Sequence, residues 1–123
     1  MMSGIVNANL EVFIHLTVRD SSGQPHGVEV LIDTGYNGFL TLPSSLITLL
    51  GLPWLCSQPA QLAGGSIVTL DVYTATVEWH GQQRIVEVDA ADSCPLLGMR
   101  IMLDSNLRIE VVASGTAEIY ERP

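Results

Sequence analysis

The sequence predicts a single domain that is mainly β, with about eight or nine strands and one or two short helices. Apolar and polar residues alternate with a period of two along most of the chain, as they do in half-buried strands. Only one stretch has clear helix signals at both of its ends. A length of 123 residues suits one domain and leaves no room for a second of comparable size, so we expect residues 1–123 to fold together.

The first half of the chain is expected to contain a hairpin, a short strand and a helix. Val12–Val18 and Val28–Ile32 both alternate in polarity, and the stretch between them is dense in turn residues. The apolar segment Phe39–Leu42 predicts a short strand. The helix expected over 44–50 ends at Gly51, because glycine readily adopts the left-handed conformation that closes helices.

The second half is expected to contain strands joined by tight turns. Gly64-Gly65 predicts a two-residue hairpin turn, because glycine permits the positive φ angles that such turns need. His80-Gly81-Gln82 predicts a second turn. The other expected elements, in chain order, are a strand over Ile67–Trp79, a strand over Arg84–Val88, a short helix over Leu97–Leu103, and closing strands over Leu107–Val112 and Ala117–Tyr120.

The composition excludes several classes of protein. Apolar residues make up 47% of the chain and charged residues 15%, which is too few charges for a disordered tail. The net charge is −8 and the five cations are scattered arginines, so neither nucleic acid nor an anionic membrane is an expected partner. No apolar run is long enough to span a membrane, and the first residues lack the features of a secretory signal. We therefore expect a cytoplasmic protein.

No metal site or cofactor is predicted. Cys56 and Cys94 are too few for a disulfide framework, there is no C-x-x-C spacing, and the histidines stand alone. We expect both cysteines to be small buried side chains in a reducing compartment. No Ser–His or Cys–His pair is visible, so a nucleophilic hydrolase has little support.

The segment Val30-Leu31-Ile32-Asp33-Thr34-Gly35 is the most informative one for function. An apolar strand ends at a carboxylate, and a carboxylate in such a place must be paired, hydrogen-bonded or protonated. The simplest interpretation is that Asp33 caps a turn shaped by Thr34 and Gly35, in an ordinary β-barrel domain.

Asp33-Thr34-Gly35 after a hydrophobic strand resembles the active-site motif of aspartic proteases. Pro95-Leu96-Leu97-Gly98 resembles the second hallmark of that clan, and Gly64-Gly65 lies between the two, where the family has its flap. This order is that of a retroviral-type protease subunit, and the resemblance covers about residues 10–113. More narrowly, the segment Asp33–Pro43 resembles the single-domain retropepsin-like proteases encoded in prokaryotic genomes.

The resemblance implies a closed, barrel-like acid-protease fold and an aspartic endopeptidase that uses neither metal nor cofactor. Such an enzyme needs two carboxylates that share one proton. The chain contains one Asp-Thr-Gly, so the second carboxylate has to come from a second copy in an obligate C2 homodimer. Terminal segments, Ile5–Leu10 and Ala117–Tyr120, are expected at the dimer interface. Little sequence precedes the first strand, so no large pro-segment is expected. The substrate would be a peptide or protein.

The resemblance also implies roles for individual residues. Asp33 would be the catalytic carboxylate, Thr34 would reach across to the partner's loop, and Gly35 would support the carboxylate through its amide. Gly98 would pack closely under the Asp33 loop beside Leu97. Flap and substrate contacts would come from Leu31, Tyr36, Phe39, Gly64, Gly65, Ser66, Ile67 and Leu96.

Two alternatives remain open at this point. A domain with the same fold could be a non-catalytic dimerisation or peptide-binding module, or the Asp-Thr-Gly could be only a turn in a generic β-barrel. The three interpretations differ in whether two Asp33 carboxylates meet across a two-fold axis.

Overall fold

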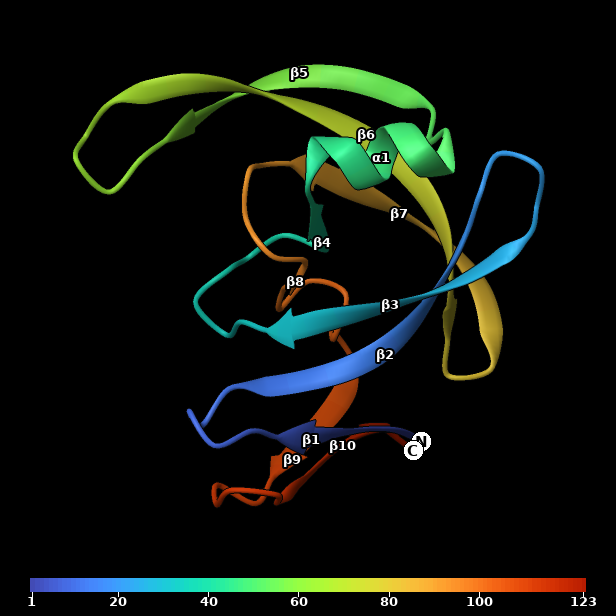
Figure 1. The fold of residues 1–123 in the computed structure, drawn as a ribbon, viewed down its shortest axis with the longest axis vertical. Helices are drawn as coiled ribbons and strands as arrows, with labels where there is room; N and C mark the ends of the chain where they lie inside the picture. The colour runs from blue at the N-terminus through green and yellow to red at the C-terminus, as the bar shows by residue number, and fades with distance from the viewer.

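The computed structural model of the protein describes residues 1–123 as ten strands and one helix (Figure 1). The expectation of a mainly β domain is confirmed. In chain order the elements are β1 (Met2–Val6), β2 (Val12–Arg19), β3 (Pro25–Ile32), β4 (Leu40–Leu42), α1 (Ser44–Leu50), β5 (Trp54–Gln61), β6 (Ile67–Trp79), β7 (Gln82–Ala90), β8 (Leu96–Leu97), β9 (Ser105–Ile109) and β10 (Thr116–Glu121).

All ten strands belong to one strongly curved sheet with the order β5-β6-β7-β4-β8-β3-β2-β1-β10-β9. β6 also pairs with β2, which brings the two arms of the curved sheet together. β8 runs parallel to β3, β4 runs parallel to β7, and all other pairs are antiparallel. The predicted hairpin of β2 and β3 is present, with Val18 opposite His26.

The core lies inside the curve of the sheet and is closed by α1 (Figure 1). From Ile14 to Val18 every second residue of β2 is buried, as the alternation in the sequence predicts, and Leu16 and Val18 have no exposed surface. Ile47 and Leu50 bury the apolar face of the predicted helix. Each such aliphatic side chain contributes about 1.5–3 kcal/mol to stability. No helix is long and apolar enough to cross a membrane.

The short helix expected over Leu97–Leu103 is absent. Leu97 belongs to β8, and the following residues form tight turns in which Met102 N–H donates to the Met99 carbonyl and Ser105 N–H to the Met102 carbonyl. The N–H groups of Gly98, Met99 and Arg100 donate to carbonyls of the loop after β3, at Phe39, Tyr36 and Gly38, so contacts with that loop set the conformation of this segment.

Two other local expectations need correction. The Gly64-Gly65 hairpin has a three-residue connection, since Leu62 N–H donates to Ser66 O and Gly65 N–H to Leu62 O. Only Gly65 of the two has a positive φ, 88°. The strand expected over Leu107–Val112 begins two residues earlier and ends at Ile109, after which the chain turns toward β10.

The terminal segments pair within the chain. β1 lies between β2 and β10, and β10 lies between β1 and β9, so neither strand has a free edge. Residues 7–10, part of a segment expected to form an interfacial strand, form a turn in which Asn7 Oδ1 accepts the N–H groups of Asn9 and Glu11. β9 and β5 are the edge strands of the sheet.

Candidate active site

Asp33 lies directly after β3, where the strand leaves the sheet. Its backbone N–H donates to the Leu97 carbonyl at 2.9 Å, which ties the start of the loop to β8. Its Oδ1 accepts the Gly35 N–H at 2.9 Å. The carboxylate is therefore held by its own loop while remaining partly accessible to solvent.

Residues 33–39 form a loop, which we name the Asp33 loop. It is held in place by β8 and by the residues that follow β8. Leu96-Leu97 is inserted between β3 and β4, with Leu97 opposite both Ile32 and Leu40. Gly98 N–H donates to Phe39 O and Met99 N–H donates to Tyr36 O, at 3.0 and 2.8 Å. A Cβ on Gly98 would collide with the Gly38 carbonyl oxygen, so only glycine allows this close approach.

Tyr36 supports the same loop from within the protein. Its hydroxyl donates to Asp89 Oδ2 at 2.6 Å and also lies 3.2 Å from the Leu40 carbonyl oxygen. Burial, followed by the hydrogen bond to Asp89, raises the pKa of Tyr36 well above its usual range. The phenol is therefore neutral and joins the Asp33 loop to β7, rather than lying free in solvent.

Thr34 and Gly35 lie on the outer side of the loop. Both are exposed, and the Thr34 hydroxyl makes no hydrogen bond within the chain. Leu31, Phe39 and Leu96 lie nearby and are partly buried, whereas Leu97 is fully buried. These side chains line the base of the loop.

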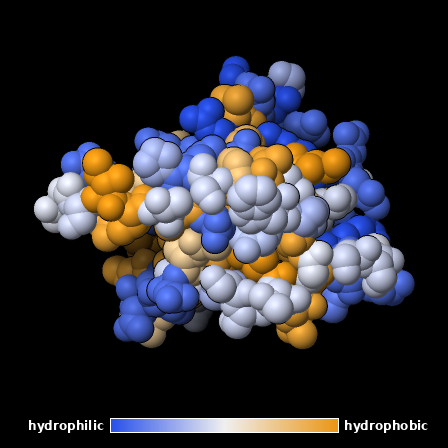
Figure 2. All heavy atoms as spheres, turned by 90° about the horizontal axis from the view of Figure 1, so that it is seen from above, coloured by the Kyte–Doolittle hydropathy of each residue, from blue (hydrophilic) through white to orange (hydrophobic).

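The hairpin of β5 and β6 projects from the body on the side of the Asp33 loop (Figure 1). Gly64, Gly65, Ser66 and Ile67 are exposed at or beside its tip, and no hydrogen bond joins them to the Asp33 loop. Seen from above, apolar groups lie open at the projecting end of the molecule (Figure 2). Leu62 and Ile67 are 51% and 73% exposed.

Comparisons with known proteins agree with this geometry at the level of the fold. No family model and no curated protein matches the sequence. Among solved structures, a retropepsin-like aspartic protease from Rickettsia conorii matches with a TM-score of 0.62 and 16% identity, over 96% of this chain and 88% of that one. EIAV protease, in complex with the inhibitor HBY-793, matches with a TM-score of 0.56 and 20% identity, over 75% of this chain and 85% of that one. The fold is retropepsin-like.

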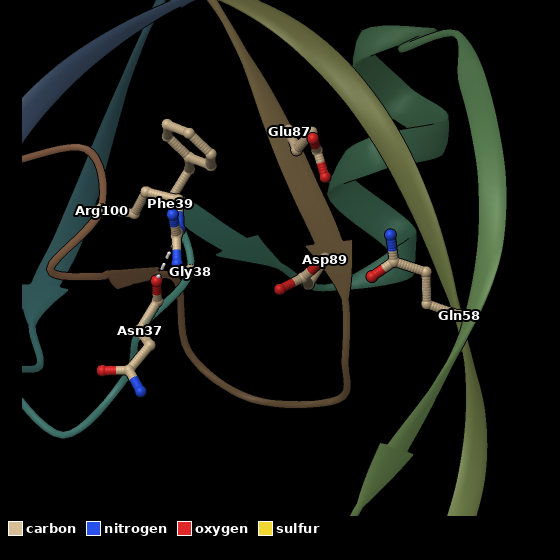
Figure 3. Close-up of a pocket in the computed structure, with 7 residues that line it drawn as sticks. All are labelled: Asn37, Gly38, Phe39, Gln58, Glu87, Asp89 and Arg100. Atoms are coloured by element: carbon tan, nitrogen blue, oxygen red, sulfur yellow. Dashed lines mark hydrogen bonds between the residues drawn. The ribbon is translucent and has the colours of Figure 1, made fainter.

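Within this retropepsin-like fold, a cavity of about 470 Å³ opens beside the Asp33 loop (Figure 3). It is lined by Asn37, Gly38, Phe39, Gln58, Glu87, Asp89 and Arg100. Of these residues, only Phe39 was predicted from the sequence as a site residue. The predicted strand, Arg84–Val88, contained Glu87 but ended before Asp89. In β7 both residues alternate with the buried Val86 and Val88, so they point to the same side of the strand.

Away from this cavity, we looked for a metal site, a buried cysteine and a Ser–His pair. No three His, Cys, Asp or Glu side chains come together as metal ligands. Cys56 is half-buried and Cys94 is exposed, so the expectation that both are buried is wrong. A Ser–His contact that the sequence did not reveal exists between Ser105 Oγ and His80 Nε2, 2.9 Å apart, but no cavity opens beside it.

Proposed function

We propose that the protein is an aspartic endopeptidase that works as a homodimer, with one Asp33 carboxylate from each subunit. One observation supports this most directly. Asp33 stands at the end of a strand, in a loop fixed by Gly98 and Gly35 contacts, within a retropepsin-like fold. The chain contains no second Asp-Thr-Gly, so a single copy supplies half of the required pair.

The chemistry follows from two carboxylates that share one proton. The ionised carboxylate takes a proton from a water molecule, whose oxygen attacks the carbonyl carbon of the scissile peptide bond. The protonated carboxylate donates its proton to the carbonyl oxygen, and a tetrahedral intermediate forms. Proton transfer to the amide nitrogen then releases the two products. Like charges this close cannot both ionise cheaply, so the pair works as a unit.

The remaining site residues are assigned parts in this proposal. Thr34, with a hydroxyl that is not used within its own chain, would bond to the partner's Asp33 loop. Gly64, Gly65, Ser66 and Ile67 would close over an extended substrate. Leu31, Tyr36, Phe39 and Leu96 would bound the substrate groove. Because β1 and β10 are fully paired, an interface near the termini would use exposed side chains, such as the 63% exposed Ile5.

The test compares two variants that remove the same charge. Asp33→Asn should abolish hydrolysis of a peptide library monitored by mass spectrometry. Asp92→Asn, in an exposed loop without hydrogen bonds of its side chain, should keep it. Retained turnover in purified Asp33→Asn protein would exclude the mechanism.

Mixing wild type and Asp33→Asn protein tests the shared site. With random pairing, an equal mixture contains about one quarter wild-type dimers, so activity should fall to about one quarter rather than one half. A fall to one half would indicate that each chain works alone.

A further inference from the structure

The cavity beside the Asp33 loop has one wall made of carboxylates. Glu87 and Asp89 are two residues apart on β7 and so share a face of the strand. Glu87 is exposed and takes part in no hydrogen bond or ion pair within the chain. Asp89 uses Oδ2 to accept the Tyr36 hydroxyl, and its Oδ1 has no partner. We name Glu87 and Asp89 the carboxylate wall.

The rest of the lining is also polar. Figure 3 shows Gln58, from β5, beside Asp89, while Asn37 and Arg100 lie on the opposite side of the cavity. Arg100 Nε donates to the Asn37 carbonyl at 3.2 Å, and Arg100 forms no ion pair with either residue of the carboxylate wall. Phe39 is the one apolar side chain among the seven lining residues. The cavity thus offers carboxylate acceptors on the side of β7 and little apolar surface.

The position of the cavity relates it to a bound peptide. Asn37, Gly38 and Phe39 belong to the Asp33 loop, and Gln58 belongs to the projecting hairpin. A peptide that runs between the hairpin and Asp33 would therefore pass the mouth of the cavity. Alternate side chains of an extended peptide point to the same side, so one of them can enter.

We propose that this cavity is a specificity subsite that binds a basic side chain of the substrate against the carboxylate wall. The inference rests on the proposed peptidase function and adds the substrate class to it. Arginine is preferred to lysine, because its forked guanidinium can donate to two carboxylates at once. The net charge of −8 also attracts basic peptides. In the proposed dimer, the two-fold axis repeats the subsite on both sides of the scissile bond.

The experiment uses peptide pairs that differ only in arginine or citrulline at one position, scanned along a cleaved sequence. Citrulline keeps the shape of arginine and removes its charge. At one or more positions, kcat/KM should favour arginine roughly tenfold, as expected for charge-assisted hydrogen bonds. In the Glu87→Gln variant this ratio should fall below about threefold. The control Glu121→Gln, which removes the same charge at an exposed position of β10, should keep the wild-type ratio.

Equal cleavage of both peptides at every position, or an unchanged ratio in Glu87→Gln, would overturn the subsite and leave the peptidase proposal standing. If no peptide is cleaved, the peptidase proposal fails, and binding decides the subsite separately. Fluorescence anisotropy with Asp33→Asn protein should then show tighter binding of the arginine peptide than of the citrulline peptide. Equal or absent binding of the two would overturn the subsite as well.

Discussion

The hydrogen bond between Tyr36 and Asp89 joins the Asp33 loop to β7, which lies far from it in the sequence, and helps to set the position of that loop. A tyrosine hydroxyl that donates to a carboxylate at 2.6 Å in a partly buried place is a strong contact. Neither partner could be paired from the sequence, because 53 residues separate them and nothing local marks the pairing. What the sequence did allow was the prediction of an ordered loop after Ile32.

Replacing Tyr36 by phenylalanine should cost about 1–2 kcal/mol of unfolding free energy, since Asp89 loses its donor. The raised pKa of Tyr36 has a further effect. The burial of the neutral Tyr36 phenol adds to the unfolding free energy as long as the unfolded chain also keeps this phenol protonated. This stabilisation is therefore fully present below the ordinary tyrosine pKa of 10.0 and is lost as the pH rises above it. Urea unfolding at pH 8, 10 and about 11 measures both effects.

Tyr120→Phe is the matched control, because the Tyr120 hydroxyl makes no hydrogen bond. It should leave both the stability and its pH dependence at wild-type values. Equal stability of wild type and Tyr36→Phe at pH 8 would show that the hydrogen bond from the Tyr36 hydroxyl to Asp89 does not stabilise the fold.

Gly98 and Gly64 form a second matched pair. A Cβ on Gly98 would collide with backbone, whereas a Cβ on Gly64 would meet nothing within 4 Å. Gly98→Ala should therefore lower stability by about 1–3 kcal/mol and reduce peptide hydrolysis, because the Asp33 loop has to move. Gly64→Ala should change stability by less than about 0.5 kcal/mol. Thermal unfolding measures the stability of the two variants. An equal loss of stability in both would contradict the close packing of Gly98 against the Asp33 loop.

The elements that the sequence predicted well are those with local signals. The alternation in β2 and β3 and the Gly51 stop of α1, which has a φ of 65°, act within a few residues. β8 has only two residues and exists because β3 and β4 flank it, so no periodicity could reveal it. The prediction of a helix over Leu97–Leu103 was wrong for a related reason, since contacts with the Asp33 loop and the start of β9 define that segment.

The projecting hairpin permits a test at the scale of one element. Ile67, at the start of β6, and Ile85, on β7, are both 73% exposed. Replacing either by serine should hardly change stability, because little surface is buried. Only Ile67→Ser should reduce kcat/KM, by about threefold to tenfold, because it would remove the apolar contact that the proposed function assigns to Ile67 with the substrate. Equal kinetics of the two variants would argue against closure of the hairpin over the substrate.

At the scale of the whole molecule, the charge opposes assembly of the proposed dimer. Each chain carries a net charge of −8, so two copies repel each other. Raising the ionic strength from about 0.01 M to about 0.15 M shortens the Debye length from about 30 Å to about 8 Å. The dimer fraction in sedimentation velocity should therefore increase with salt.

Thr34→Val should shift the same equilibrium toward monomer, because the exposed hydroxyl would lose its proposed partner across the axis. Thr69→Val, on the projecting hairpin and exposed, is the control and should leave it unchanged. A monomer at high micromolar concentration in both salts would contradict the dimer.

The pairing of β1 with β10 has a mechanical consequence. Met2 lies opposite Ile119, so both chain ends leave the sheet at the same end of an antiparallel pair (Figure 1). A force that separates the two ends would load the hydrogen bonds of this pair one after another, as in a zipper, since these bonds lie perpendicular to the strands. Stretched between its termini in optical tweezers, the molecule should lose β1 and β10 first and at low force. The strands around Asp33 would yield only in a later, separate step.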